Sequence, residues 1–201
     1  MSEYLPWIEK YRPQKLTEII CNEQNLIILK NMLKGNSLPH LLFHGTSGTG
    51  KTSTIICLAK QIYNEKQYSE YVLELNASDD RGLYMINNTI YPFCKKKTSC
   101  VGFGEKDFGK YPSHKLVILD EADSITPKAQ NLLSNIISEF RKNTRIVFIC
   151  NDCTQIIESI QSRCMIVKYP RISSENLYDK KILGEIILYF NSLYQKSKTS
   201  T

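Results

Sequence analysis

Long apolar runs are missing from this chain of 201 residues. No window approaches the roughly 18 consecutive apolar residues of a membrane-spanning helix, so the sequence predicts no membrane partner. The first residues, MSEYLPW, have neither the positive start nor the apolar core of a secretory signal. No internal repeat is evident. We therefore expect a soluble protein that stays inside the cell.

A regular cysteine framework is also missing. The seven cysteines are odd in number and lack the spacing of a disulfide scaffold, so we interpret them as reduced thiols. Cys150 and Cys153, in the stretch CNDC, could bind zinc together with Cys94 and Cys100. A zinc site is disfavoured, because CNDC follows an apolar strand and the spacing of the other pair is unusual.

A strong charge of either sign is absent as well. The chain has 26 Lys and Arg against 20 Asp and Glu, a formal net charge of +6. This balance permits an anionic partner without requiring one. With 42% hydrophobic and 23% charged residues, the composition is that of an ordinary globular protein with one main domain.

Short apolar runs alternate with helical patterns from residue 41 onward, which is typical of strand–helix–strand units with a parallel sheet. Each run is apolar on both faces, as expected for a strand that helices cover on both sides. The expected strands are residues 41–44, 72–75, 116–119, 146–149 and 165–168. The sequence thus predicts an α/β fold with a five-stranded parallel sheet flanked by helices.

Helical patterns fill the intervals, at residues 52–64, 83–91, 127–140 and 155–161. The segment 94–114 has no periodicity, and we expect an exposed insertion there. Beyond Arg171 apolar residues recur at helical spacing until a polar end begins. We therefore divide the chain into a core at 1–171 and a partial helical segment with a polar tail at 172–201. Its helix is expected to pack on the core rather than face a partner.

The stretch HLLFHGTSGTGKTST contains the pattern Gly45-x-x-x-x-Gly50-Lys51-Thr52. It follows an apolar run and opens a helical pattern, which is the context that indicates a phosphate-binding loop. Glycines let backbone N–H groups point at phosphate oxygens, and the helix N-terminus adds partial positive charge. On this exposed loop Lys51 would reach the β- and γ-phosphates of ATP, and Thr52 would ligate Mg²⁺. The other loop residues expected to contact the nucleotide are Thr46, Ser47, Gly48 and Thr49.

Two carboxylates directly follow another apolar run, in KLVILDEAD. Asp120, at the strand tip, would hold the Mg²⁺ shell, and Glu121 would polarise the attacking water. The four letters DEAD could by themselves be a charged turn. Together with the phosphate loop they make ATP hydrolysis the leading hypothesis.

Several segments together resemble the small subunits of replication factor C, the sliding-clamp loader among the AAA+ ATPases. PWIEKYRP looks like the family's N-terminal box, and LELNASDDRG looks like another of its boxes. ICN at 149–151, followed by SRC at 162–164, completes the set in the family's order. The resemblance extends from residue 4 to about residue 175 and implies the fold of an AAA+ P-loop NTPase.

The resemblance implies roles that the spacing alone does not show. Tyr11 and Arg12 would line the adenine pocket. Asn151 would be the polar sensor that touches the γ-phosphate or orients the water. Arg163 would be an arginine finger in the neighbouring subunit's site, where its permanent charge neutralises the transferred phosphoryl group.

The resemblance also implies partners, which are sister subunits, a sliding clamp and primer-template DNA. Arg81 would contact a DNA backbone phosphate, whereas a solvated loop is the better interpretation of the lysines at 95–97. The segment IYPF at 90–93 matches the region where the family touches the clamp, and a core position is equally consistent with it. Such partners imply a nuclear protein, or a cytoplasmic one if its origin is not nuclear.

The sequence departs from the family after the core. Clamp-loader subunits continue with a helical lid, which has a second arginine sensor, and with a helical collar that joins the subunits. No arginine follows Arg171, and residues 179–201 do not match the family well. We therefore expect an incomplete C-terminal helical lid, and a chain that is monomeric and turns over slowly when alone.

The main hypothesis is an ATP-hydrolysing subunit that helps to open a sliding clamp and load it onto primed DNA during replication or repair. The alternative is a shortened AAA+ module that binds ATP or sister subunits with little turnover of its own. A helicase of the DEAD type is disfavoured, because NASDDRG and SRC have no place in it. Such a helicase would also need a second core, for which the chain has no room.

Overall fold

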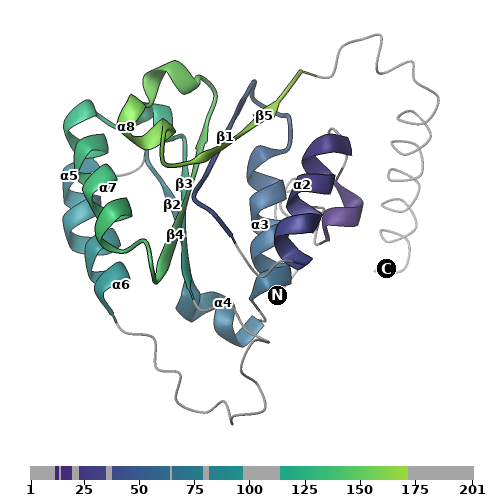
Figure 1. Ribbon diagram of the computed structural model, residues 1–201, viewed down its shortest axis with the longest axis horizontal. Helices are drawn as coiled ribbons and strands as arrows, with labels where there is room; N and C mark the ends of the chain where they lie inside the picture. Colours follow the sequence, from purple (N-terminus) through teal and green to yellow (C-terminus); the bar gives the residue numbers. More distant parts are fainter. Residues whose placement is uncertain are drawn as a thin grey trace, which may run out of the picture.

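A parallel sheet forms the middle layer of the molecule, with helices on both of its faces (Figure 1). The computed structural model describes residues 12–13, 15–19, 23–34, 38–63, 65–78, 82–96 and 114–171. Within these ranges, no helix combines the length and apolar character that crossing a membrane would require. The segment 172–201, where we expected a partial lid, lies outside the described residues.

The sheet has five strands in the order β2-β3-β4-β1-β5, and every neighbouring pair is parallel. The strands are β1 (Leu41–Gly45), β2 (Val72–Asn76), β3 (Lys115–Asp120), β4 (Thr144–Cys150) and β5 (Met165–Tyr169). This confirms the predicted five-stranded parallel sheet. Because all strands point the same way, their carboxyl ends lie along one edge.

One face of the sheet is covered by α2 (Glu23–Lys34) and α3 (Lys51–Ile62), on the right in Figure 1. The short turn η1 (Leu16–Glu18) contributes buried Leu16 to the same core. Helix α4 (Glu65–Tyr71) leads directly into β2 at the lower end of the sheet. The sequence pattern had not identified α2, although its apolar residues recur at helical spacing.

The opposite face is covered by a longer series of helical segments, on the left in Figure 1. In chain order they are α5 (Gly82–Met85), the π-helical turn η2 (Ile86–Ile90), α6 (Tyr91–Lys95), α7 (Pro127–Glu139) and α8 (Glu158–Gln161). Two 3-10 turns complete this set, η4 (Ala122–Ser124) and η5 (Cys153–Gln155). The π-helical turn ends two residues before Pro92, which has no N–H to donate to the regular helical ladder.

Alternate side chains of the central strands fill two separate cores. Leu41 and Phe43 point to the α2–α3 face, whereas Leu42 between them packs on the α7 face, and all three are fully buried. This alternation is the period of two that a pleated strand imposes. Each such side chain stabilises the fold by roughly 1.5–3 kcal/mol relative to an exposed position.

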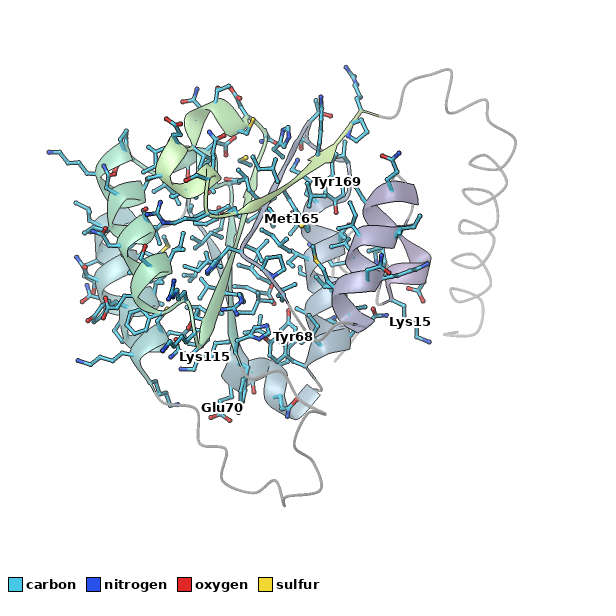
Figure 2. All side chains as sticks on the ribbon, viewed as in Figure 1. Lys15, Tyr68, Glu70, Lys115, Met165 and Tyr169 are labelled. Carbon is cyan, nitrogen blue, oxygen red and sulfur yellow. The ribbon has the colours of Figure 1, made fainter. Side chains whose placement is uncertain are left out.

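The expectation that every strand is covered on both faces is wrong for β5. Met165 and Ile166 are 38% and 47% exposed, while Val167 and Tyr169 are buried. The reason is that β5 is an edge strand among the strands that the structure describes, where it pairs with β1 alone (Figure 2). A continuous apolar run in the sequence does not distinguish an edge strand from a central one.

Two predicted segments also differ in detail. The helix expected at 83–91 continues to Lys95, so the start of the expected insertion is helical, and Cys94 is buried. In the IYPF segment Ile90 is fully buried, and Tyr91 and Phe93 pack against the same core. These contacts favour the core position for that segment, and clamp contact by it stays a prediction.

A cluster of basic side chains lies at the opposite edge of the sheet, where the strands begin. His40 precedes β1, His114 precedes β3, and Arg145 is the second residue of β4. Burial, followed by the charge of Arg145, lowers the pKa of His40 and that of His114 to about 4. Both imidazoles are therefore neutral at physiological pH.

We expect this cluster to make stability depend on acid. Below pH ~6.5 the unfolded chain binds protons at both histidines and the folded chain does not, so stability falls as pH drops towards 4. His114→Phe keeps the edge contact with Tyr63 and removes one titrating group. The free energy of unfolding, measured with urea at several pH values between 7 and 5, should then change with pH less steeply, by up to ~1.4 kcal/mol per pH unit. An unchanged pH dependence would mean that His114 binds its proton equally well in the folded and the unfolded chain.

Candidate functional site

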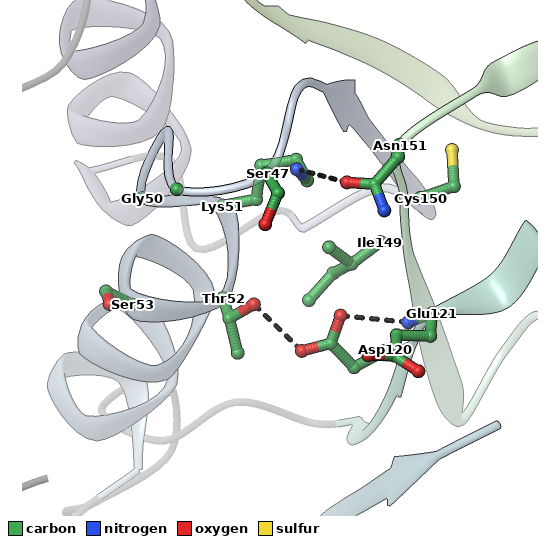
Figure 3. A pocket seen from close by; sticks show the side chains of 11 residues that line it. Ser47, Gly50, Lys51, Thr52, Ser53, Asp120, Glu121, Ile149, Cys150 and Asn151 are labelled. Carbon is green, nitrogen blue, oxygen red and sulfur yellow. Dashed lines mark hydrogen bonds between the residues drawn. The ribbon is translucent and has the colours of Figure 1, made fainter. Parts of the chain in front are cut away.

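Three loops that follow β1, β3 and β4 meet at the carboxyl edge of the sheet (Figure 3). The loop after β1 leads into α3, which begins with Lys51 and Thr52, while β3 ends at Asp120 and Asn151 directly follows β4. Parallel pairing in register brings these strand ends together although they are far apart in the chain. The residues predicted from separate motifs therefore line one site.

The glycines of the first loop are required by its backbone. An added Cβ on Gly45 would lie 2.1 Å from the carbonyl oxygen of Tyr169 on β5, so only glycine fits there. Gly50 has φ 85° at the start of α3, a left-handed conformation that side chains disfavour. Within the loop, Thr49 Oγ1 donates to the carbonyl of Thr46 at 2.8 Å. These constraints hold the turn open in front of the helix N-terminus.

Lys51 is held over the loop by three hydrogen bonds. Its Nζ donates to the carbonyls of Gly45 at 2.7 Å and Thr46 at 2.9 Å, and to Asn151 Oδ1 at 3.1 Å (Figure 3). The expectation of an exposed side chain is wrong, because Lys51 begins α3 and is only 7% exposed. Burial lowers its pKa, and the carboxylate of Asp120 opposes this effect. A fixed, partly desolvated ammonium is suited to bind phosphate oxygens.

Thr52 and Asp120 form the second contact across the site. Thr52 Oγ1 donates to Asp120 Oδ2 at 2.8 Å, and the other oxygen, Oδ1, accepts from the backbone N–H of Glu121 at 2.9 Å. A hydroxyl and a carboxylate at this distance are hard oxygen donors, which Mg²⁺ prefers in proteins. The pair therefore fits the magnesium ion expected from the sequence.

Glu121 has an unusual backbone, with φ 52° in the left-handed region. Its carbonyl accepts from Ser124 N at 2.9 Å and from Ser124 Oγ at 2.8 Å, and these bonds close the turn η4. A non-glycine residue in this conformation is strained, and such strain often accompanies function. Here it turns the chain at the strand end and leaves the Glu121 side chain exposed at the pocket.

A pocket of about 300 Å³ lies between these side chains. It is lined by Ser47, Gly48, Gly50, Lys51, Thr52, Ser53, Asp120, Glu121, Ile149, Cys150 and Asn151. A second pocket of about 390 Å³ is lined by residues 46–49 of the same loop and by Arg171. Most of the predicted nucleotide-binding residues thus border one of two adjoining cavities.

Further charges surround the phosphate loop. His44 on β1 lies opposite Lys168 of β5, and its pKa is lowered by burial and then by the charges of Lys168 and Lys51. Cys150, fully buried in the strand beside it, has its pKa raised to about 12, chiefly by burial. The two lysines place positive charge beside the phosphate loop, which favours an anionic ligand there. Among the described residues, no group of three or more His, Cys, Asp or Glu side chains could hold a metal such as zinc.

The remaining predicted site residues lie away from these cavities or outside the described ranges. Arg12 is half-buried near Cys57 and Tyr68, whose pKa values its charge lowers slightly against the dominant effect of burial. Arg163 is exposed after α8 and donates to the carbonyl of Ser159. Tyr11 and Arg81 are not among the described residues. The roles assigned to all four stay predictions.

The sequence interpretation missed two side chains that hold the segment after β4 by hydrogen bonds to its backbone. Asp123 accepts hydrogen bonds from the backbone of the loop after β4. Gln130, only 1% exposed, donates to the carbonyls of Ile125 and Gln155 and accepts from Ile157 N. The final acid of DEAD was a visible signal for Asp123, whereas a glutamine within a helical pattern offered none.

Curated relatives match most of this chain. Human replication factor C subunit 5 is 45% identical over 171 residues, which are 85% of this chain and 47% of the relative. Yeast (Saccharomyces cerevisiae) replication factor C subunit 4 is 42% identical over 188 residues, or 94% of this chain and 55% of the relative. These matches confirm the resemblance to replication factor C subunits. The chain spans about half the length of the curated relatives it matches.

Solved structures share the fold at low sequence identity. RuvB from Thermotoga maritima aligns with a TM-score of 0.61 and 17% identity, covering 92% of this chain and 55% of that one. A DNA polymerase III gamma subunit-related protein from the same organism aligns with a TM-score of 0.53 and 16% identity, covering 73% of this chain and 47% of the other. Both support the fold alone.

A family match covers most of the described sheet and its site. Residues 41–171 match the AAA family, the ATPase family associated with various cellular activities. This range begins with β1 and includes the phosphate loop, the acid turn and the strand that ends before Asn151. The matched range and the geometry of its site together show that this chain belongs to the AAA family of ATPases.

Proposed function

We propose that this chain binds ATP with Mg²⁺ and hydrolyses it as one subunit of a DNA clamp loader. Such a loader opens a sliding clamp and places it on primed DNA during replication or repair. The observation that carries the proposal is the convergence of Lys51, Asn151, Thr52 and Asp120 on one pocket. The similarity to replication factor C subunits supports the choice of loader over other AAA functions.

The residues of the site have separate tasks in this chemistry. Lys51 would neutralise the β- and γ-phosphates while the loop N–H groups bind their oxygens. Thr52 and Asp120 would hold Mg²⁺, which would supply positive charge to offset the charge that develops on the phosphates. The Glu121 carboxylate would accept a proton from the attacking water, and Asn151 would orient that water or contact the γ-phosphate.

The partners of the chain are proposed from the same similarity. Sister subunits would flank the chain, and Arg163 would reach into one of their sites. Arg81 would contact the backbone of primer-template DNA, and Tyr11 and Arg12 would line the adenine pocket. With such a role the protein would act in the nucleus, or in the cytoplasm if its origin is not nuclear.

Removing the charge of Lys51 should weaken ATP binding at least tenfold, because charge-assisted hydrogen bonds to phosphate are lost. Lys51→Met keeps the length of the buried alkyl chain, and calorimetric titration with MgATP measures the affinity. Lys142→Met removes the same charge from an exposed turn at the far edge of the sheet and should leave affinity unchanged. A folded Lys51→Met variant with normal ATP affinity would show that this loop is not the phosphate site.

Replacing Glu121 by Gln should separate binding from hydrolysis. Glu121→Gln keeps the size of the exposed side chain but cannot accept a proton, so turnover should fall by about 10²–10⁴ while ATP affinity is kept. Phosphate release measured with sister subunits present tests this. Glu70→Gln, on α4, serves as the matched control. Normal turnover in the Glu121→Gln assembly would remove this residue as the base.

Arg163 should act only on a neighbour. Arg163→Ala should leave ATP affinity of the isolated chain unchanged, because the exposed side chain does not line its own pocket. In an assembly, hydrolysis at the adjacent sister site should fall by about 10³–10⁵. Arg141→Ala, in an exposed turn, is the control. A loss of turnover in the isolated chain after Arg163→Ala would contradict action in trans.

A further inference from the structure

The carboxylate of Asp123 connects two loops of the site. Its Oδ2 accepts from the backbone N–H of Asn151 at 3.0 Å and from that of Asp152 at 3.5 Å. Asp123 belongs to the turn η4 after β3, whereas both donors belong to the loop after β4. The contact therefore joins two loops that are separated in the chain by α7 and β4.

Asn151 is held at both its backbone and its side chain among the described contacts. Its side chain is exposed, with Lys51 bound to its amide oxygen and Asp123 bound to its backbone N–H. Its Oδ1 accepts from Lys51 Nζ, which leaves the Nδ2 end of the amide, drawn away from Lys51 in Figure 3, as the donor for a phosphate oxygen or water. A shift of the Asn151 backbone would move that donor directly.

The turn that presents Asp123 is itself fixed. The carbonyl of Glu121 accepts from both the backbone N–H and the hydroxyl of Ser124. Asp123 does not cap this turn, because the N-cap position is Glu121 and no side chain bonds there. The Asp123 carboxylate therefore accepts hydrogen bonds from the loop after β4 and does not cap its own turn.

We propose that Asp123 is a positioning residue that holds Asn151 where its amide distinguishes ATP from ADP. The inference rests on the proposed role of Asn151 at the γ-phosphate. The Asp123 side chain acts through the Asn151 backbone and does not touch nucleotide. One turn would thereby place both the proton-accepting Glu121 and, through Asp123, the γ-phosphate donor.

The affinities of the full chain for MgATP and MgADP, measured by calorimetric titration, test this inference. Asn151→Ala should lower the ATP-to-ADP affinity ratio by about tenfold, the loss expected for one hydrogen bond to a charged group. Asp123→Ala should lower the ratio by a similar factor, and the double variant should lose no more than either single one. Asp123→Asn keeps an acceptor oxygen and should retain most of the preference for ATP.

Asp152→Ala is the matched control. It removes an equal charge from the same loop, where the Asp152 side chain bonds within η5, to Thr154 and Gln155, and the ratio should not change. If Asp123→Ala does not fold, Asp123→Ser replaces it, since the shorter side chain cannot span the loops.

The possible outcomes distinguish a failure of the positioning role of Asp123 from a failure of the proposed nucleotide site. A normal ratio in Asp123→Ala, or additive losses in the double variant, would overturn the positioning role alone, provided that Asn151→Ala lowers the ratio. A normal ratio in Asn151→Ala would remove the sensor role of Asn151 and the inference with it. A wild-type chain without ATP affinity would refute the proposed nucleotide site itself.

Discussion

The parallel pairing of β1 with β4 is the constraint on which the site depends. The pairing sets His44 of β1 beside Cys150 of β4, so the phosphate loop and Asn151 begin at the same level of the sheet. In an antiparallel pair the same two loops would leave from opposite edges. The hydrogen bond from Lys51 to Asn151, 100 residues apart in the chain, exists only because of this register.

The buried ammonium of Lys51 shows how the loop is organised for an anion. Burying a charge is costly unless hydrogen bonds compensate for lost water. Two backbone carbonyls and one amide oxygen supply that compensation here, and they hold the side chain near the backbone N–H groups at the start of α3. The cationic group is thus already placed, so little side-chain freedom remains to be lost on binding.

The loop from Asn151 to Arg163 is held at two points on the same face of the sheet. Asp123 binds its beginning, and buried Gln130 of α7 binds its middle through Gln155 and Ile157. The helix α8, which ends just before Arg163, follows this second anchor. Asn151, proposed for the chain's own site, and Arg163, proposed for a neighbour's site, therefore lie at the two ends of the same supported loop.

Much of this molecule could be predicted from local pattern. Five apolar runs, the spacing of Gly45, Gly50, Lys51 and Thr52, and the acids after β3 specify strands, a loop and their chemistry, because each depends on residues close together in the chain. Sequence similarity to a known family added Asn151 as a further site residue.

Only the tertiary structure decided which strands are edges, that Lys51 is buried, and that Asp123 and Gln130 support the loop after β4. The local sequence of an apolar run is the same whether the strand has one neighbour or two. Likewise, the sequence around a carboxylate does not show whether it faces water or accepts from a distant N–H. These properties depend on neighbours that are brought close by sheet register and helix packing, and no local pattern records which neighbours those will be.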